Sequence, residues 1–255
     1  MHAFETNRRD LRSNDRSVRC PRQGFTLIEL LTVIAIISIL AGVAVSGFSS
    51  VGARNFSTQS LQISDTLERA REYAVANNTY TWVTFYASTA TPSQPVVYVA
   101  TVVSVNGTSQ ILSNGSLGSS AQWSSGQVDT TATGSKCALL DKVASFPQMG
   151  LSNLGSYNSL ISKLPAVASS NLAPLASSTG SPAGPSFLIN VPGLGSQTFT
   201  QSIEFTPSGE AKVQAAPTQA IEFDLCQYHG ASASSTMVAA VRVNGFTGQA
   251  EVYQP

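Results

Sequence analysis

The sequence predicts an α+β protein in which a long N-terminal α-helix packs on an antiparallel β-sheet domain. Three observations support this fold class. Residues 25–48 are a continuous apolar run, residues 49–77 place apolar and small side chains at helical spacing, and residues 78–255 are rich in strand-like segments. Only 11% of the 255 residues are charged, so the surface is expected to be neutral and polar.

Residues 1–24 form a basic leader. They contain six arginines and three acidic residues, so their net charge is 6 − 3 = +3, and the remaining 8 basic and 11 acidic residues give −3. Basic charge ends where the apolar run begins, which predicts that the leader stays in the cytoplasm and that the rest is exported. A net-negative body also disfavours nucleic-acid binding, because nucleic-acid-binding proteins usually carry a basic patch.

The apolar run of residues 25–48 contains one charged residue, Glu29. A membrane-spanning helix needs about 20 residues, so we expect this run to be the transmembrane half of the N-terminal helix. The alternative is a cleaved secretory signal with a small-residue site near Ala44 and Ser46. The apolar core of such a signal is only about 7 to 15 residues long, which favours the membrane helix.

Residues 49–77 are expected to continue this helix as an amphipathic, periplasmic half, ending at Asn77 and Asn78. Apolar or small residues recur there at three- and four-residue spacing: Phe56, Ser60, Ile63, Leu67, Ala70 and Ala74. We call these six residues the helix stripe. We expect the stripe to pack on the sheet, with Trp82 and Phe85 close to it.

Beyond residue 78, β-branched and aromatic residues predict strands at 79–88 and 96–105. Residues 106–135 are expected to be an exposed loop, because 22 of these 30 residues are Ser, Thr, Gly, Asn or Gln. A short helix is predicted at 156–164, and the serine-rich segment 165–186 is expected to be irregular.

The C-terminal third is predicted to be the most regular part. Residues 201–214 are interpreted as two strands around a Pro-Ser-Gly turn, and residues 219–228 as another strand. Residues 235–254 are predicted to form a final hairpin whose bend lies at Asn244 to Gly248.

The segment "RQGFTLIELLTVIAIISILAG" closely resembles the N-terminus shared by type IV pilins and type II secretion pseudopilins. The resemblance implies that a prepilin peptidase cuts between Gly24 and Phe25 and methylates the new N-terminus at Phe25. It also implies a pilin-like fold and a single-pass protein of the bacterial inner membrane, with its C-terminal domain in the periplasm. Its expected partners are other pilin or pseudopilin subunits, an inner-membrane assembly platform and membrane lipid.

Glu29 then occupies the position of the family's glutamate. A carboxylate at the centre of a membrane helix costs about 2.5 to 3.5 kcal/mol, so its presence needs a reason. In stacked subunits, the Glu29 carboxylate can pair with the Phe25 amine of a neighbour and set the register of assembly. The alternative is that Glu29 snorkels to the membrane interface near the helix end.

The C-terminal segments "IEFTPSGEAKV" and "VRVNGFTGQAEVY" more loosely resemble the globular domain of H-type minor pseudopilins and T-type fimbrial proteins. The favoured function is therefore a minor pilin or pseudopilin of a secretion pseudopilus or pilus-like filament. Some T-type relatives take up DNA through basic residues. Here only Lys212 and Arg242 lie in the final hairpins, which disfavours this second function. A membrane-anchored exported protein of unrelated activity is the third alternative.

Catalytic and metal-binding patterns are scarce, so we expect no enzyme activity and no cofactor. His229 beside Gly230 is interpreted as a turn residue. Glu204, Glu222 and Asp224 could gather on adjacent strands as a cation site, but solvated strand faces are the favoured interpretation.

Two cysteines remain after leader removal, because Cys20 leaves with the leader. Export would allow Cys137 and Cys226 to form a disulfide. Two separate buried thiols are an equally weighted alternative.

Overall fold

The computed structural model describes residues 26–88, 95–109, 127–152, 155–178, 181–216 and 218–255, apart from the side chains of residues 41–53. The chain divides into two compact units, Met1–Ser49 and Ser50–Pro255. Helix α1 (Leu27–Ala76) contributes to both units.

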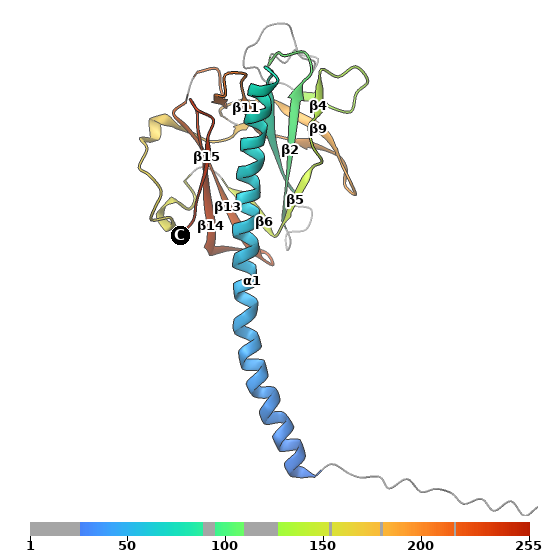
Figure 1. The fold of residues 1–255 in the computed structure, drawn as a ribbon, viewed down its shortest axis with the longest axis vertical. Helices are drawn as coiled ribbons and strands as arrows, with labels where there is room; N and C mark the ends of the chain where they lie inside the picture. The colour runs from blue at the N-terminus through green and yellow to red at the C-terminus, as the bar shows by residue number, and fades with distance from the viewer. Residues whose placement is uncertain (1–25, 89–94, 110–126, 153–154, 179–180, 217) are drawn as a thin grey trace, which may run out of the picture. The chain divides into compact units, whose positions relative to one another are not determined.

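The second unit combines the C-terminal part of α1 with three sheets that are mostly antiparallel, which confirms the α+β class (Figure 1). The large sheet has the order β12 (Ala211–Lys212), β11 (Gln201–Phe205), β1 (Thr81–Ser88), β2 (Val96–Ser104) and β4 (Cys137–Leu139). In addition, β5 (Ala144–Pro147) pairs with β2, and β8 (Ala176–Ser177) pairs with β11.

Two further sheets complete this unit. The small sheet has the order β10 (Gly195–Phe199), β9 (Ser186–Val191) and β3 (Gln127–Asp129). The C-terminal sheet has the order β15 (Ala250–Tyr253), β14 (Ser232–Asn244), β13 (Ala220–His229) and β6 (Met149–Ser152), with β7 (Leu172–Ala173) beside β13.

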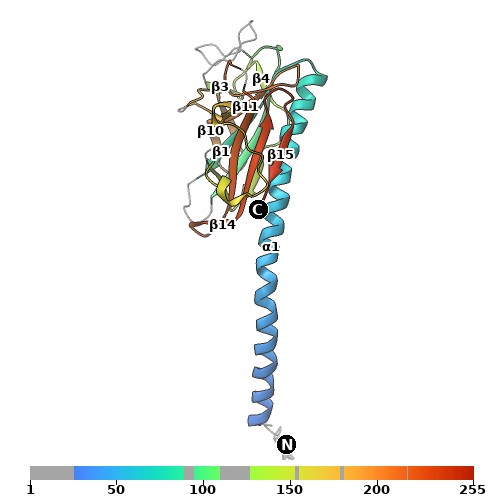
Figure 2. The ribbon, with the colours of Figure 1, turned by 90° about the vertical axis from the view of Figure 1, so that its left-hand side faces the viewer.

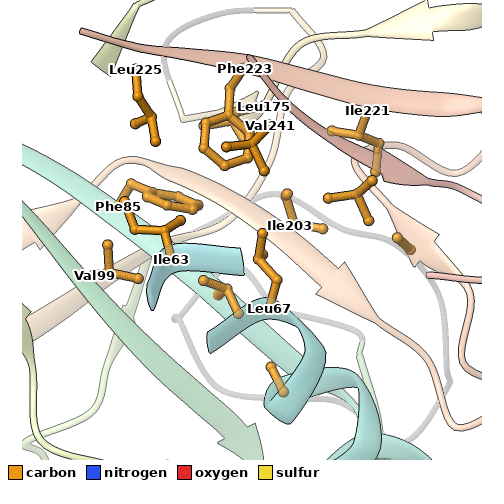
Figure 3. Close-up of a cluster of buried hydrophobic side chains, with 14 of the residues drawn as sticks. Ile63, Leu67, Phe85, Val99, Leu175, Ile203, Ile221, Phe223, Leu225 and Val241 are labelled. Carbon is orange, nitrogen blue, oxygen red and sulfur yellow. The ribbon is translucent and has the colours of Figure 1, made fainter. Parts of the chain in front are cut away.

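The main core lies where α1, the large sheet and the C-terminal sheet meet. Side chains from all three converge in Figure 3: Ile63 and Leu67 from α1, Phe85, Val99 and Ile203 from the large sheet, and Ile221, Phe223, Leu225 and Val241 from the C-terminal sheet. Phe85 and Phe223 bring the two sheets into direct contact, with ring centroids 5.1 Å apart. The core therefore belongs to no single sheet.

The helix stripe is confirmed, because all six of its residues are at most 3% exposed. Its one polar member, Ser60, donates to the Ser57 carbonyl at 2.9 Å and accepts from Gln254 Nε2 at 2.8 Å. Glu68 Oε1 accepts the backbone N–H of Ala250 at 2.6 Å. These bonds hold the helix along β15, beside which it runs in Figure 2.

The expectation that Trp82 packs near the stripe is wrong, whereas Phe85 does join Ile63 and Leu67 in the main core. Residues three apart on a strand point to opposite faces, because the side-chain period is two. Trp82 therefore lies on the other face of the large sheet. It forms a second core there with residues of the small sheet, and its ring centroid is 5.6 Å from that of Phe187.

The strands predicted at 79–88, 96–105, 201–214, 219–228 and 235–254 are all present. The irregular segments are more ordered than expected. Strand β3 lies inside the predicted loop 106–135, and 165–186 contains a 3₁₀ turn (Ser169–Asn171), β7 and β8. These strands have only two or three residues, so tertiary pairing rather than local sequence determines them.

Two other elements differ from the sequence prediction. The helix predicted at 156–164 is a single 3₁₀ turn, η1 (Asn158–Leu160), and the β9–β10 hairpin was not predicted. Gly193 and Gly195 form its bend, both with φ above +70°, a conformation that favours glycine.

The bend between β14 and β15 requires its glycines. A Cβ on Gly245 would lie 1.8 Å from the Thr218 carbonyl oxygen, and one on Gly248 would lie 2.2 Å from that of Gly209. Gly248 also has φ +68°. Asn244 Oδ1 accepts the backbone N–H groups of Phe246 and Thr247, which closes the bend. The predicted hairpin bend is therefore confirmed.

Leu67→Ala should destabilise the second unit by about 2 to 5 kcal/mol, because it leaves a cavity where the helix meets both sheets. Urea unfolding of residues 50–255, followed by tryptophan fluorescence, measures this change. Leu61→Ala is the matched control, since Leu61 lies on the same helix and is 60% exposed, and it should shift stability by at most about 0.5 kcal/mol. Equal effects of the two variants would contradict the packing described here.

Candidate functional site

The start of α1 carries the predicted assembly residue, Glu29, in its first turn. Thr26 precedes the helix, and its Oγ1 accepts the backbone N–H of Glu29 at 3.3 Å. Thr26-Leu-Ile-Glu29 therefore has the spacing of a capping box, with a carboxylate placed near the positive end of the helix dipole. This local role of Glu29 was missed at the sequence level, although the Thr-x-x-Glu pattern could have indicated it.

The described side chains on either side of Glu29, in residues 27–40, are almost all apolar and exposed. Ten of them are between 48% and 83% exposed: Leu27, Ile28, Leu30, Leu31, Val33, Ile34, Ile36, Ile37, Ile39 and Leu40. At 100° per residue these positions surround the helix, which is typical of a segment that is covered on all sides. The hydroxyls of Thr32 and Ser38 bond to carbonyls of the same helix, so they need no outside partner.

The other predicted processing residues, Gly24 and Phe25, lie outside the described residues. The predicted span 25–48 also extends beyond the described side chains, which stop at Leu40 in this part of the helix. Over the residues that the structure describes, no helix has both the length and the apolar character needed to cross a membrane.

The acidic residues considered for a cation site are not on solvated strand faces, and that interpretation is wrong. Glu204, Glu222 and Asp224 are each at most 2% exposed. Glu204 belongs to the large sheet, whereas Glu222 and Asp224 lie on one face of β13 in the C-terminal sheet. Within the described ranges, no group of three His, Cys, Asp or Glu side chains is arranged to hold a metal ion.

Glu222 is held by a buried ion pair. Arg242, its direct cross-strand neighbour on β14, donates to Glu222 Oε2 through Nε at 2.9 Å and also through Nη2. The guanidinium further donates to the Pro165 carbonyl and lies over the ring of Tyr253. Arg242 is 8% exposed, so it is committed to this network and does not offer a charge to a nucleic-acid phosphate.

The second cation named for DNA binding, Lys212, is also paired, because its Nζ lies 3.3 Å from Glu210 Oε2. Lys212 stands opposite Glu204 in the register of β11 and β12. These contacts weaken the DNA-uptake alternative at both basic residues on which it depended.

Glu204 is buried beside the second core, and Trp82 Nε1 donates to its Oε2 at 3.0 Å. Burial raises the pKa of Glu204 to about 8, and the Trp82 hydrogen bond and Lys212 only partly oppose that rise. The side chain is therefore largely protonated at neutral pH, which removes most of the free-energy cost of a buried charge.

The proposed disulfide is not formed, because Cys137 and Cys226 are both free thiols. Cys137 packs with Trp82 in the second core, and Cys226 lies in a third cluster on the outer face of the C-terminal sheet. Burial raises the pKa of Cys137 to about 12, which suppresses its nucleophilic thiolate form. The alternative of two separate buried thiols is the arrangement observed.

His229 was interpreted as a turn residue, but it is the last residue of β13 and pairs with Ser232 of β14, and the turn begins at Gly230.

A family comparison identifies the N-terminal region. Residues 19–45 match the family described as the prokaryotic N-terminal methylation motif, which is the signature of type IV pilins and pseudopilins. The motif includes Gly24, Phe25 and Glu29, and it implies processing by prepilin peptidase and assembly with other pilins. Searches of curated proteins and of solved structures gave no match to this chain.

Glu204→Gln should flatten the pH dependence of stability. The pKa of Glu204 is about 8 in the folded protein and near 4.5 in the unfolded chain, so the folded state holds the proton more tightly. This preference stabilises the fold fully below pH 4.5, and the stabilisation is lost as pH rises toward 8. The slope for one proton is at most about 1.4 kcal/mol per pH unit. Glutamine keeps an acceptor for Trp82 and does not ionise, so the variant should lose less stability between pH 5 and pH 9 than the wild type.

Urea unfolding at several pH values measures this difference. Glu210→Gln is the control, because its carboxylate is 42% exposed on the same hairpin and should leave the pH profile unchanged. A wild-type profile that matches that of Glu204→Gln would contradict the assignment of a buried, protonated Glu204.

Proposed function

We propose that this chain is a minor pilin or pseudopilin, a structural subunit of a type II secretion pseudopilus or a type IV pilus-like filament. The observation that carries the proposal is the methylation motif at residues 19–45. In this proposal, prepilin peptidase cuts between Gly24 and Phe25 and methylates Phe25. The leader, residues 1–24, is cytoplasmic, and residues 25–48 anchor the subunit in the inner membrane before assembly.

The exposed apolar side chains of residues 27–40 support this arrangement. Burying apolar surface contributes about 25 cal/mol per Å², so ten large apolar side chains left in water would be strongly unfavourable. Lipid covers them in the free subunit, and neighbouring helices cover them in the filament. Residues 49–77 are the periplasmic half of the N-terminal helix, and residues 78–255 are the periplasmic globular domain.

Glu29 sets the register of assembly in this proposal. Once the leader is removed, Phe25 carries a cationic amine one helical turn before Glu29. A subunit that enters with the correct axial offset places its amine against the carboxylate of a neighbour, which removes the penalty of an unpaired charge in lipid. Glu29 lies in the first turn of α1, so its carboxylate is near the helix end, where such a partner can reach it.

The globular domain acts as a structural head rather than as an enzyme. Its buried carboxylates are engaged with Trp82, Arg242 and backbone N–H groups, which is the pattern of a folding network. Uptake of DNA is disfavoured, because Arg242 and Lys212 are both paired within the domain.

Processing gives the first test of this function. Mass spectrometry of the protein from cells that contain a prepilin peptidase should find an N-terminus at methylated Phe25. Gly24→Val should block the cut, because it adds bulk at the residue that precedes the scissile bond, and the full leader should then remain. A mature chain that begins near residues 45–47 would identify an ordinary secretory signal and would contradict the proposal.

Glu29→Gln separates assembly from insertion. The variant should insert in the membrane at least as well as the wild type, because the charged group is gone. Its cleavage should be unchanged, since Gly24 and Phe25 are intact. Cross-links between cysteines placed on neighbouring subunits should fall at least tenfold, an order of magnitude typical of a lost buried ion pair. Wild-type levels of cross-linking would favour snorkelling of Glu29 instead.

A further inference from the structure

A short segment covers the outer face of the C-terminal sheet. We call residues 155–165 the strap; it follows β6, contains η1 and is drawn in yellow in Figure 1. Ile161 of the strap is 2% exposed and forms a cluster with Cys226, Val238 and Ala240 of β13 and β14. The strap therefore shields an apolar patch on the sheet face opposite the main core.

The strap is tied to the sheet by three polar contacts rather than by a long strand. The backbone N–H of Tyr157 donates to Asp224 Oδ2 at 3.0 Å, and Asn158 Nδ2 donates to Glu222 Oε1 at 2.9 Å. At its other end, the Pro165 carbonyl accepts from Arg242 Nη1 at 2.6 Å. Both ends of the strap are thus hydrogen-bonded to side chains of β13 and β14.

Glu222 and Asp224 are both buried near Arg242, but Arg242 bonds directly to Glu222. Arg242 Nε and Nη2 both donate to Glu222, so this carboxylate has its own counter-charge. Asp224, two residues further along the same face of β13, is 0% exposed. Its Oδ1 has no hydrogen-bond partner among the described residues, and the same holds for Oδ1 of Asn158. Asp224 is therefore poorly compensated as an anion beneath the strap.

We propose that the strap is a pH-responsive cover, which binds the sheet more firmly when Asp224 is protonated and loosens when Asp224 ionises. Ionisation places a second negative charge beside Glu222 under a segment that excludes water. Lifting the strap hydrates that charge. Protonation makes the Asp224 carboxyl group a hydrogen-bond donor and removes its charge repulsion with Glu222.

The surroundings of Asp224 agree with this direction. Burial is the largest influence and raises the pKa of Asp224 from 3.8 to about 6. Glu222 raises it further, while backbone N–H groups of Tyr157 and Ser156 and the charge of Arg242 oppose the rise. The other titratable groups of this face are Tyr157, Cys226, Tyr228 and Tyr253, together with Glu251, which accepts a hydrogen bond from the Tyr253 hydroxyl.

The direction of the pH effect follows because protonation of Asp224 and docking of the strap are linked equilibria. A carboxyl group whose pKa is about 6 when covered and 3.8 when exposed favours the covered state at low pH. This preference is lost as pH rises through 6. Between pH 5 and pH 7.5, these two values correspond to a change of at most about tenfold in the docking equilibrium of the strap, because Glu222 still lies beside Asp224 when the strap is lifted.

Amide hydrogen exchange of the full chain in detergent micelles tests the proposal. Exchange rates of a peptide covering residues 155–165 are divided by the intrinsic rates at pH 5 and pH 7.5, which gives protection factors independent of solvent catalysis. In the wild type, protection should be higher at pH 5, by up to about tenfold. In Asp224→Asn, which has nearly the same shape and does not ionise, protection should be equal at the two pH values.

Asp141→Asn is the matched control, because Asp141 is half exposed, follows β4 of the large sheet and contacts Arg69 of α1, and it should retain the wild-type response. The wild-type measurement decides the question even if Asp224→Asn folds poorly. Equal wild-type protection at both pH values would overturn the proposal, and so would an undiminished pH response in a folded Asp224→Asn protein.

Discussion

The packing of the helix stripe into a core shared by two sheets is the contact on which the rest of the second unit depends. Ile63 and Leu67 belong to one buried cluster with residues of both the large sheet and the C-terminal sheet, so the helix completes the core that the two sheets share. The polar bonds of Glu68 and Ser60 to the last strand fix the helix along β15. With the stripe fully used inside this unit, the exposed apolar side chains of residues 27–40 are a separate surface, available to lipid or to neighbouring subunits.

Covering both outer faces of the sheets has an electrostatic consequence. The small sheet covers the large sheet around Trp82, and the strap covers the C-terminal sheet around Cys226. Carboxylates on these faces are therefore buried, although strand alternation would normally place them in water. The cost of burying these carboxylates is reduced in two ways. Glu222 pairs with Arg242, whereas burial raises the pKa of Glu204 and of Asp224 and so favours their neutral forms. The pH sensitivity proposed for the strap arises from Asp224, the carboxyl group that lies directly beneath it.

The sequence pattern predicted the structure correctly wherever apolar residues recurred with a clear helical or strand period. The helix stripe, the paired strands β1 and β2, and the β14–β15 bend were all predictable, as was the methylation motif. Trp82 does not reach the stripe, because it is three residues from Phe85 and side chains at that spacing point to opposite faces of a strand. The strap, the short strands β3, β7 and β8, and the burial of Glu204, Glu222 and Asp224 depend on which segments lie over each sheet. That information is not local, so the sequence alone could not supply it.

Native-state hydrogen exchange of the helix in residues 50–255 tests the central claim most directly. If the stripe completes both sheets, the amides of residues 60–74 should exchange only through global unfolding. Their opening free energy should then equal that of β13 and fall with urea at the same slope. Exchange of the helix at a lower free energy, with little dependence on urea while β13 stays protected, would show that the sheets hold together without it and would contradict this account.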